Sequence, residues 1–157
     1  MTLLSVIMIE IVKLREHKEL KYETAAWFHD KWHIDTASYA QSIEECIVGN
    51  TIPQWYVALQ NNTIIGGAGV IANDFHNRKD LTPNLCALYV EQDYRNKGIA
   101  KKLLDIAIED MHSYKYMHLY LITEHTSFYE RYGWKYLCMV QEEDTDHMIR
   151  MYAFDLS

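Results

Sequence analysis

The order of apolar and polar residues along the chain predicts seven strands. Ile9–Leu14 alternates apolar and polar residues, which is the strand period. Met117, Leu119 and Leu121 alternate in the same way. The other strand candidates are Gln54–Leu59, Thr63–Ala72, Leu85–Val90, Trp134–Val140 and Met148–Phe154. Asn61 and Asn62 separate two of these segments and predict a tight hairpin turn.

A longer period predicts four helices. The clearest begins at Gly98 and has one apolar face, made of Ala100, Leu103, Leu104, Ala107, Ile108 and Met111. A second helix has Asp35 as its cap, Ile34 and Tyr39 as a hydrophobic staple, and Gly49 as its end. The other two are expected over Lys18–Trp32 and over Ser127–Tyr132, the latter stopping at Gly133.

The element order is therefore β-α-α-β-β-β-α-β-α-β-β. Hairpins and βαβ units alternate in this order, which predicts an α/β (α+β) protein with a mixed central sheet of about seven strands and about four helices. No stretch has the composition of a linker, so residues 1–157 are expected to form a single domain. Because Met8 precedes the first strand, Met1–Ile7 is either an extension or the result of an alternative start.

Composition narrows the class of protein. The chain of 157 residues carries 22 acidic and 15 basic residues, for a net charge of -7, which disfavours binding to nucleic acid. Its three cysteines, Cys46, Cys86 and Cys138, form no CxxC pair and lie in apolar stretches, as expected of buried thiols in a reducing cytoplasm. The start lacks the marks of a signal peptide, and no run approaches the ~18 apolar residues of a membrane span. We therefore expect a cytoplasmic protein without a membrane partner.

One short segment reverses the charge of the chain. Arg95, Lys97, Lys101 and Lys102 fall within eight residues that contain no acid, between a strand and the helix that follows Gly98. The N-terminus of a helix presents unpaired N–H groups, and glycine lets an anion approach the backbone there, so a pyrophosphate would fit. The simpler interpretation is a glycine at a helix start beside a solvated basic face.

The six residues Arg95-Asn96-Lys97-Gly98-Ile99-Ala100 resemble motif A of the GNAT superfamily of N-acetyltransferases, Q/R-x-x-G-x-G/A. The preceding Leu88-Tyr89-Val90, the helix behind the motif and the downstream stretch Phe128–Trp134 strengthen the resemblance, and the element order agrees from Met8 onward. The resemblance implies a mostly antiparallel GNAT-like sheet and acetyl-CoA as co-substrate, with no metal. It also allows a homodimer.

The resemblance assigns roles to individual residues. The backbone N–H groups of Arg95, Asn96, Lys97, Gly98, Ile99 and Ala100 would hold the pyrophosphate, with Lys101 adjacent. Leu88, Tyr89 and Val90 would hydrogen-bond the pantetheine arm, and an N–H near Tyr89 or Val90 would stabilise the oxyanion. Tyr129 matches the tyrosine that protonates the departing thiolate; otherwise it is an aromatic residue packed on the sheet.

The sequence departs from the family pattern at two places. An asparagine found in many relatives before the short helix is absent from Thr123–Ser127, and Leu85 stands where some relatives have a glutamate base. The base is left open between Glu91, Asp74, His76, His125 and an ordered water. A covalent cysteine route is disfavoured, because neither Cys86 nor Cys138 has a histidine paired with it nearby in the sequence.

Other signals have a structural explanation as well as a functional one. His29 and His33 have the spacing of zinc ligands but lack a third ligand, so metal binding is not expected. Gly66–Gly69 favours a bulge or a close backbone approach over a dinucleotide site. Some of the aromatic residues Trp27, Phe28, Trp32, Trp55 and Tyr56 could face a substrate rather than the core. The acidic loop with Glu142, Glu143, Asp144 and Asp146 is either a solvated hairpin or a surface that attracts an ammonium group.

These observations lead to a functional expectation. The chain is expected to move acetyl from acetyl-CoA to a primary amine by direct attack in a ternary complex. The acceptor is expected to be a small molecule, such as an aminoglycoside-like compound, a polyamine or an amino-acid derivative. The alternatives are acetylation of a protein N-terminus or lysine, and a non-catalytic module that only binds acyl-CoA.

Overall fold

The computed structural model describes residues 8–157, so the expectation for Met1–Ile7 lies outside the described residues. Its strands are β1 (Ile9–Lys13), β2 (Gln54–Gln60), β3 (Thr63–Ile71), β4 (Asn84–Val90), β5 (His118–Thr123), β6 (Lys135–Gln141) and β7 (Met148–Asp155). The α-helices are α1 (Lys21–Trp32), α2 (Thr36–Val48) and α3 (Ile99–Ser113), joined by short 3-10 turns. Within residues 8–157, none of the helices combines the length and the apolar character that crossing a membrane requires.

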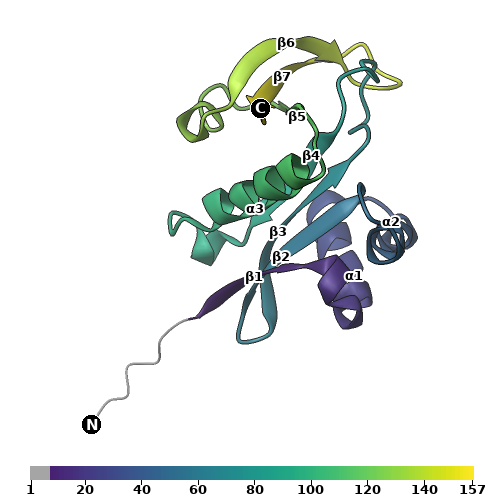
Figure 1. Cartoon of the computed structure of the whole chain (residues 1–157), viewed down its shortest axis with the longest axis vertical. Helices are drawn as coiled ribbons and strands as arrows, with labels where there is room; N and C mark the ends of the chain where they lie inside the picture. Colours follow the sequence, from purple (N-terminus) through teal and green to yellow (C-terminus); the bar gives the residue numbers. More distant parts are fainter. Residues whose placement is uncertain (1–7) are drawn as a thin grey trace.

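All seven strands form one sheet in the order β1-β2-β3-β4-β5-β7-β6. Every neighbouring pair is antiparallel except β4 and β5, which are parallel and share a single registered pair, Asn84 with Tyr120. Figure 1 shows the consequence: β5, β7 and β6 form a unit that turns away from β1–β4. The expected mixed, mostly antiparallel sheet is therefore confirmed.

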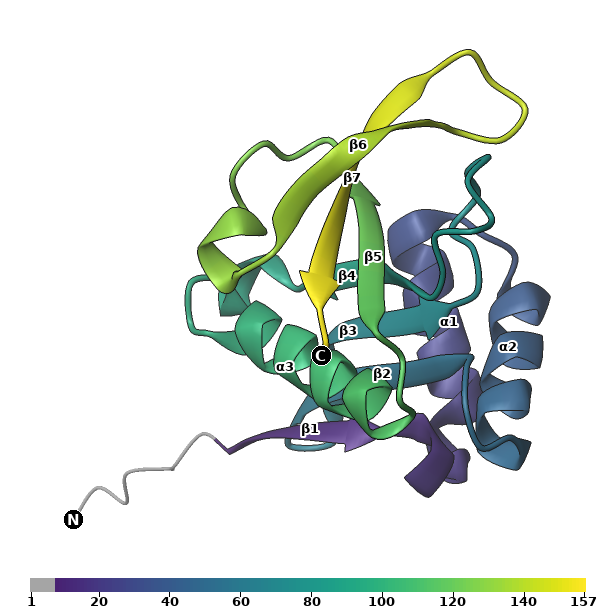
Figure 2. The same ribbon diagram turned by 45° about the horizontal axis from the view of Figure 1, so that its top comes forward.

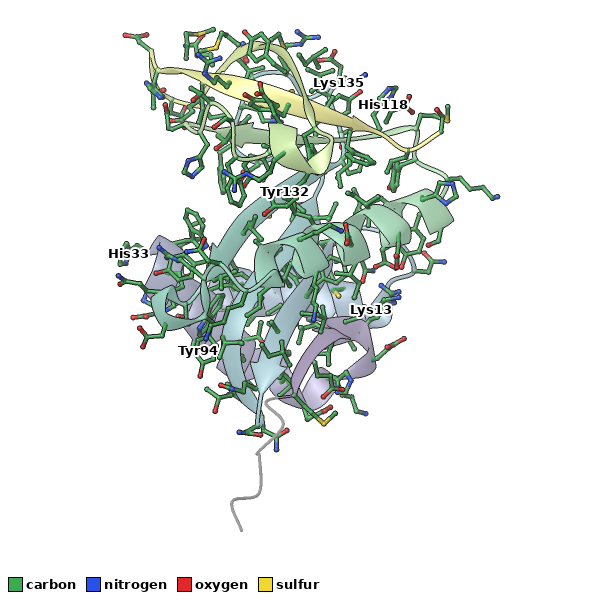
Figure 3. The ribbon with its side chains drawn as sticks, turned by 90° about the vertical axis from the view of Figure 1, so that its left-hand side faces the viewer. Lys13, His33, Tyr94, His118, Tyr132 and Lys135 are labelled. Carbon is green, nitrogen blue, oxygen red and sulfur yellow. The ribbon has the colours of Figure 1, made fainter. Side chains whose placement is uncertain are left out.

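The two faces of the sheet carry separate cores. Tyr56 and Ala58 of β2 pack with α3 on one face, whereas Trp55 and Val57 pack with α1 and α2 on the other. This is the alternation that a strand imposes on its side chains. Figure 3 shows Tyr132 on the side of the β5–β7–β6 unit that faces α3, while His118 and Lys135 lie on the outer part of that unit.

The long elements agree with the periodicity, whereas the short ones differ in detail. Asn61 and Asn62 both have positive φ, as the predicted tight turn between β2 and β3 requires. The expected helix over Ser127–Tyr132 is only the 3-10 turn Glu130–Tyr132, because Gly133 ends it after one turn, so three α-helices are described rather than about four. The first helix begins three residues late, since Lys18–Leu20 is a 3-10 turn.

Some smaller expectations were wrong. Asp35 occupies the cap position of α2, but its side chain makes no capping hydrogen bond. Cys46 and Cys86 are buried free thiols, whereas Cys138 is only partly buried because it lies on β6, the edge strand of the sheet.

The glycines of β3 confirm the expected close approach and bulge. A Cβ on Gly67 would lie 2.7 Å from the Phe28 ring, and one on Gly69 would lie 2.4 Å from the Trp55 ring. Between these glycines the register with β4 shifts, because Gly67 pairs with Tyr89 and Gly69 pairs with Cys86. Aromatic rings from α1 and β2 therefore occupy the space that side chains would fill.

An ion pair with a buried carboxylate, which the sequence analysis did not identify, ties the 3-10 turn Leu14–Glu16 after β1 to α3. Asp110 is 3% exposed and accepts two hydrogen bonds from Arg15, at 2.6 and 2.8 Å, and one from the Tyr56 hydroxyl at 2.6 Å. These hydrogen bonds and the charge of Arg15 outweigh the desolvation of the carboxyl, so the pKa of Asp110 is lowered.

Candidate acetyl-transfer site

The first part of the site is the N-terminus of α3. Gly98 precedes the helix with φ of 80°, and no side chain caps the helix at this point. A Cβ built on Gly98 would have no atom within 4 Å, so the space beside this turn is open. Asn96 also has positive φ, 62°, which folds the loop tightly before the helix. The result is a turn with uncapped N–H groups and free space in front of it, which suits an anion.

The basic side chains of this turn are arranged around it. Arg95 donates from Nε to the carbonyl of Val90 at 2.8 Å, and its guanidinium lies 5.2 Å from the centre of the Tyr89 ring. The Lys101 Nζ donates to Asp105 at 2.7 Å on the exposed face of α3. The structure therefore groups the expected residues Arg95, Asn96, Lys97, Gly98, Ile99, Ala100 and Lys101 at one helix end, beside Tyr89 and Val90.

The second part is the gap between β4 and β5. The two strands are registered only at Asn84 and Tyr120, and beyond this pair they separate. β4 also bulges, because Ala87 and Leu88 both lie opposite Ala68. Ala87 has φ of 56°, and its carbonyl accepts a hydrogen bond from Trp32 Nε1 at 3.2 Å. The bulge and the separation leave one edge of β4 without a registered partner strand over Leu85–Val90 in the described chain.

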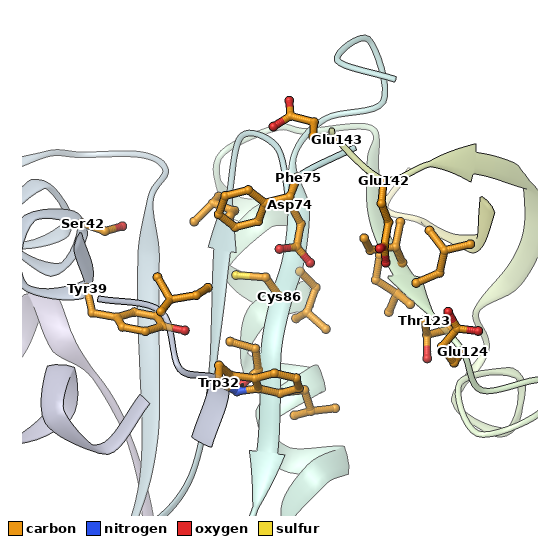
Figure 4. Close-up of a pocket in the computed structure, with 18 of the residues that line it drawn as sticks. Trp32, Tyr39, Ser42, Asp74, Phe75, Cys86, Thr123, Glu124, Glu142 and Glu143 are labelled. Carbon is orange, nitrogen blue, oxygen red and sulfur yellow. Dashed lines mark hydrogen bonds between the residues drawn. The ribbon is translucent and has the colours of Figure 1, made fainter. Parts of the chain in front are cut away.

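A cavity of about 840 Å³ opens at this gap. β4 contributes Leu85 to Leu88, β5 contributes Leu121 to Thr123, and the loops and helices around them supply the remaining walls. Figure 4 shows the arrangement, with Tyr39 and Ser42 on the side of α2 and Glu142 and Thr123 on the opposite side. Of the expected donor-binding residues, Leu88 reaches the cavity wall, whereas Tyr89 and Val90 lie outside it.

The cavity lining carries negative charge. Its described lining contains four carboxylates, from Asp74, Glu124, Glu142 and Glu143, and neither lysine nor arginine. In this acidic wall the β3–β4 loop supplies Asp74, the β6–β7 loop supplies Glu142 and Glu143, and Glu124 follows β5. The two loops are joined, since the Glu143 N–H donates to the Phe75 carbonyl at 2.9 Å and His76 bridges to Glu142. Figure 2 shows these two loops at the same end of the molecule. Such a wall attracts a cation.

Only part of the acidic loop belongs to this wall. Glu142 and Glu143 line the cavity, whereas Asp144 and Asp146 are exposed and do not. At the rim, His147 Nε2 lies 2.6 Å from Glu124 Oε1, and this contact raises the pKa of His147. Of the five aromatic residues considered as substrate contacts, Trp32 and Trp55 line the cavity, whereas Trp27, Phe28 and Tyr56 do not.

Tyr129 is placed at the cavity but deep in its wall. The side chain is 8% exposed, and its ring packs against Phe128, Trp134 and Tyr152. Burial, with a smaller contribution from the charge of Asp74, raises the pKa of Tyr129, so the phenol stays protonated at neutral pH. Both expectations for this residue, a proton donor and a packed aromatic residue, are thus compatible with its position.

The structure separates the base candidates. Glu91 lies outside the cavity lining and accepts hydrogen bonds from Lys31 and from Trp27 Nε1, so its charge is neutralised within the protein. His76 is fully buried; its Nδ1 accepts the Arg78 N–H at 3.1 Å and its Nε2 donates to Asn84 Oδ1 at 2.5 Å. His125 is exposed at the cavity wall, and Asp74 points into the cavity.

Several cavity residues were not singled out as site residues by the sequence. Tyr39 belongs to the apolar stripe of α2, yet its hydroxyl is buried without a hydrogen-bond partner in the described chain. Ser42 accepts from Trp55 Nε1 at 2.8 Å. No local pattern marks these residues, because the cavity is formed by elements distant in the sequence. The spacing of His29 and His33 has a structural explanation, since His29 Nδ1 donates to the Ile34 carbonyl at 2.7 Å.

Comparisons with known proteins agree with this geometry. Residues 52–136 match a family model described as acetyltransferase (GNAT) domain. No curated protein matches the chain in sequence.

Three solved structures share the fold over nearly the whole chain. An aminoglycoside 6'-N-acetyltransferase complexed with coenzyme A has a TM-score of 0.70 at 19% identity, covering 96% of this chain and 98% of that one. A GNAT acetyltransferase from Staphylococcus aureus Mu50 has a TM-score of 0.66 at 25% identity, covering 96% and 100%. The PaiA N-acetyltransferase from Thermoplasma acidophilum in complex with coenzyme A has a TM-score of 0.62 at 21% identity, covering 95% and 99%.

Proposed function

The chain belongs to the GNAT family of acetyltransferases, and from its site we propose that it transfers acetyl from acetyl-CoA to a primary amine of a small cationic molecule. One observation carries the choice of acceptor: the cavity at the β4–β5 gap has four carboxylates and neither lysine nor arginine in its described lining. A cationic amine is stabilised there before any chemistry occurs, whereas an anionic acceptor is repelled.

The residues around α3 fit the donor. The open space at Gly98 and the uncapped helix end suit a pyrophosphate, and Arg95 and Lys97 add positive charge, whereas Lys101 is paired with Asp105. Acetyl-CoA supplies a thioester whose carbonyl is open to attack by an amine. The edge of β4 over Leu88–Val90, which lacks a registered partner strand in the described chain, suits hydrogen bonding to an extended arm.

Tyr129 is assigned the last proton transfer. It lies on the cavity wall, and burial keeps its hydroxyl protonated, so it can donate to a thiolate that leaves from the gap. The acidic cavity, which Tyr129 also lines, receives the amine.

The small size of the acceptor follows from the cavity. A volume of about 840 Å³ is of the order of a ligand pocket for a small molecule. Two solved structures of the same fold, at 19% and 21% identity, are aminoglycoside acetyltransferases, which agrees with an acceptor that carries several amino groups.

The direct test is release of free thiol from acetyl-CoA across a panel of amines. The panel contains an aminoglycoside, a linear polyamine, an amino-acid amide and a lysine-containing peptide. We expect turnover with a small multivalent cation. Turnover restricted to the peptide would indicate a protein acetyltransferase, and a thermal shift with CoA without turnover on any amine would indicate a binding module.

A matched pair of variants tests the acidic wall. Replacing Glu142 and Glu143 with glutamine should raise the KM for a dicationic acceptor roughly tenfold, because each carboxylate contributes on the order of 0.5–1 kcal/mol. The control replaces Asp144 and Asp146 with asparagine, which removes the same charge from the same loop outside the cavity. Equal effects of the two double variants would show that only net charge matters.

A further inference from the structure

The backbone at Asp74 is fixed beside the point where β4 and β5 separate. The Asp74 N–H donates to Asn84 Oδ1 at 3.0 Å, and the same oxygen receives His76 Nε2 at 2.5 Å. Asn84 is fully buried and forms the single registered pair between β4 and β5. The loop after β3 is thereby held against the strand whose edge opens into the gap, and Figure 4 shows the carboxyl of Asp74 directed into the cavity.

The carboxyl of Asp74 is unpaired within the described residues. In residues 8–157 neither of its oxygens accepts a hydrogen bond from a side chain or the backbone, or pairs with a lysine or arginine. Glu91, by contrast, is held by Lys31 and Trp27, and Glu124 is paired with His147. Asp74 is therefore a partly buried carboxylate that is free to accept a proton from a ligand.

The groups around Asp74 come from four elements. Tyr39 of α2, Cys86 of β4, Tyr129 and Glu142 lie close enough for their charges or protonation to be coupled to it. Burial, and then the negative charge of Glu142, raise the pKa of Asp74 to about 6. The carboxyl is thus ionised at neutral pH, and its affinity for a proton is higher than that of an ordinary aspartate, as a general base requires.

We propose that Asp74 is the general base of acetyl transfer, in place of the glutamate that Leu85 excludes from the start of β4. The proposal rests on the proposed function. An acceptor ammonium in the cavity gives one proton to the Asp74 carboxylate, which later passes it to solvent. The amine lone pair then forms the N–C bond while the carbonyl π electrons move to oxygen.

The remaining steps balance without another reactant. The electrons on oxygen re-form the carbonyl, and the C–S bond breaks with its electrons on sulfur. The thiolate takes the proton of the Tyr129 hydroxyl, and the second proton of the amine nitrogen restores that hydroxyl. The products are the amide, free CoA thiol and one proton released through Asp74.

The test is Asp74→Asn, assayed with the amine of the panel that gives the highest turnover. At about pH 7, kcat/KM should fall between about 10²-fold and 10⁴-fold, the range of general base catalysis. The pH profile should also change shape. The wild type should lose kcat/KM below about pH 6 and be level from there to the pKa of the amine, whereas the variant should climb about tenfold per pH unit across that range, because it needs an amine that is already neutral.

Asp80→Asn is the matched control, since Asp80 lies in the same loop, is exposed and pairs with Arg78. It should leave kcat/KM unchanged. Binding of CoA to both variants, followed by thermal shift, should match the wild type.

Two outcomes would overturn the proposal. One is an Asp74→Asn enzyme within threefold of the wild type; the other is a loss of activity that is equal at every pH, which would mean a structural role. If the variant does not bind CoA, the wild-type profile decides: an acid limb near pH 6 supports the role of Asp74, and its absence contradicts it. If the wild type acetylates no amine while CoA still binds, the proposed function itself fails.

Discussion

Asp74→Asn should stabilise the folded chain even though it disables the proposed chemistry. Burial and the charge of Glu142 raise the pKa of Asp74 from its ordinary value of 3.8 to about 6. Each pKa unit corresponds to ~1.4 kcal/mol, so the ionised carboxylate costs the folded state roughly 3 kcal/mol. Asparagine has the same shape and carries no charge, and it leaves the hydrogen bond from the backbone N–H of residue 74 to Asn84 in place.

The stability that Asp74→Asn gains over the wild type should increase as the pH rises. The unfolded chain releases the Asp74 proton near pH 4, whereas the folded chain keeps it until about pH 6, so the folded state binds more protons in this interval. The contribution of Asp74 to wild-type stability therefore falls as the pH rises through the interval and is constant above it. The variant and the wild type should be about equally stable below about pH 4. Above about pH 7, the free energy of unfolding of the variant should be higher by roughly 3 kcal/mol.

Urea unfolding followed by tryptophan fluorescence measures this difference. Curves at about pH 4, 5, 6 and 7.5 give the free energy of unfolding of both proteins, provided the transition is two-state. Asp80→Asn serves as the control, because its side chain is exposed and ion-paired. The reasoning is refuted if Asp74→Asn is no more stable than the wild type at about pH 7.5, or if its advantage is as large at about pH 4.

Four further substitutions test other parts of the structure. Tyr129→Phe should lower kcat by about 10²-fold or more while CoA affinity, measured by calorimetry, stays the same; an unchanged kcat would remove the residue from the chemistry. Gly98→Ala should raise the KM for acetyl-CoA at least about tenfold and cost ~1 kcal/mol in urea unfolding, because alanine is strained at positive φ. Tyr39→Phe should leave the free energy of unfolding unchanged or raise it, since the lost hydroxyl has no partner in the described chain. Arg15→Met should cost about 3 kcal/mol in the same assay, because it removes the two short hydrogen bonds to the buried Asp110 and leaves only the longer 3.5 Å contact from Lys13 to balance its charge; a loss under ~1 kcal/mol would contradict the role of the pair.

The parts of the fold that follow from local patterns could be predicted from the sequence. The strand candidates agree with the seven strands to within a residue or two, and alternation marks two of them, β1 and β5. The apolar face of α3 locates that helix, because burial on one side of an element leaves a period in the sequence. The same holds for the turn at Gly98, where a strand, a glycine and a helix follow one another. The prediction of a short helix after β5 was wrong, since one 3-10 turn is too short to leave a period in the sequence.

The acceptor cavity could not be predicted in this way. Its walls come mainly from α1, α2, the β3–β4 loop, β4, β5 and the β6–β7 loop, and the contacts that bring them together are non-local. Asp74 was one of several base candidates of equal rank, because its hydrogen bond to Asn84 and the pairing of Glu91 with Lys31 exist only in the folded chain. Arg15 and Asp110 are 95 residues apart, so no spacing rule connects them.

The chain has a net charge of -7, and different carboxylates attract the acceptor ammonium and remove its proton. The segment that would face the anionic donor, residues 95–102, contains no acid, and the described lining of the cavity contains neither lysine nor arginine. An ammonium drawn to this cavity cannot attack a thioester until it loses a proton, and the rim carboxylate of Glu143 is exposed and lies 3.7 Å from Lys79. The more deeply placed Asp74, whose pKa the charge of Glu142 helps to raise, is suited to that task. The acids that attract the amine therefore also strengthen the base that activates it.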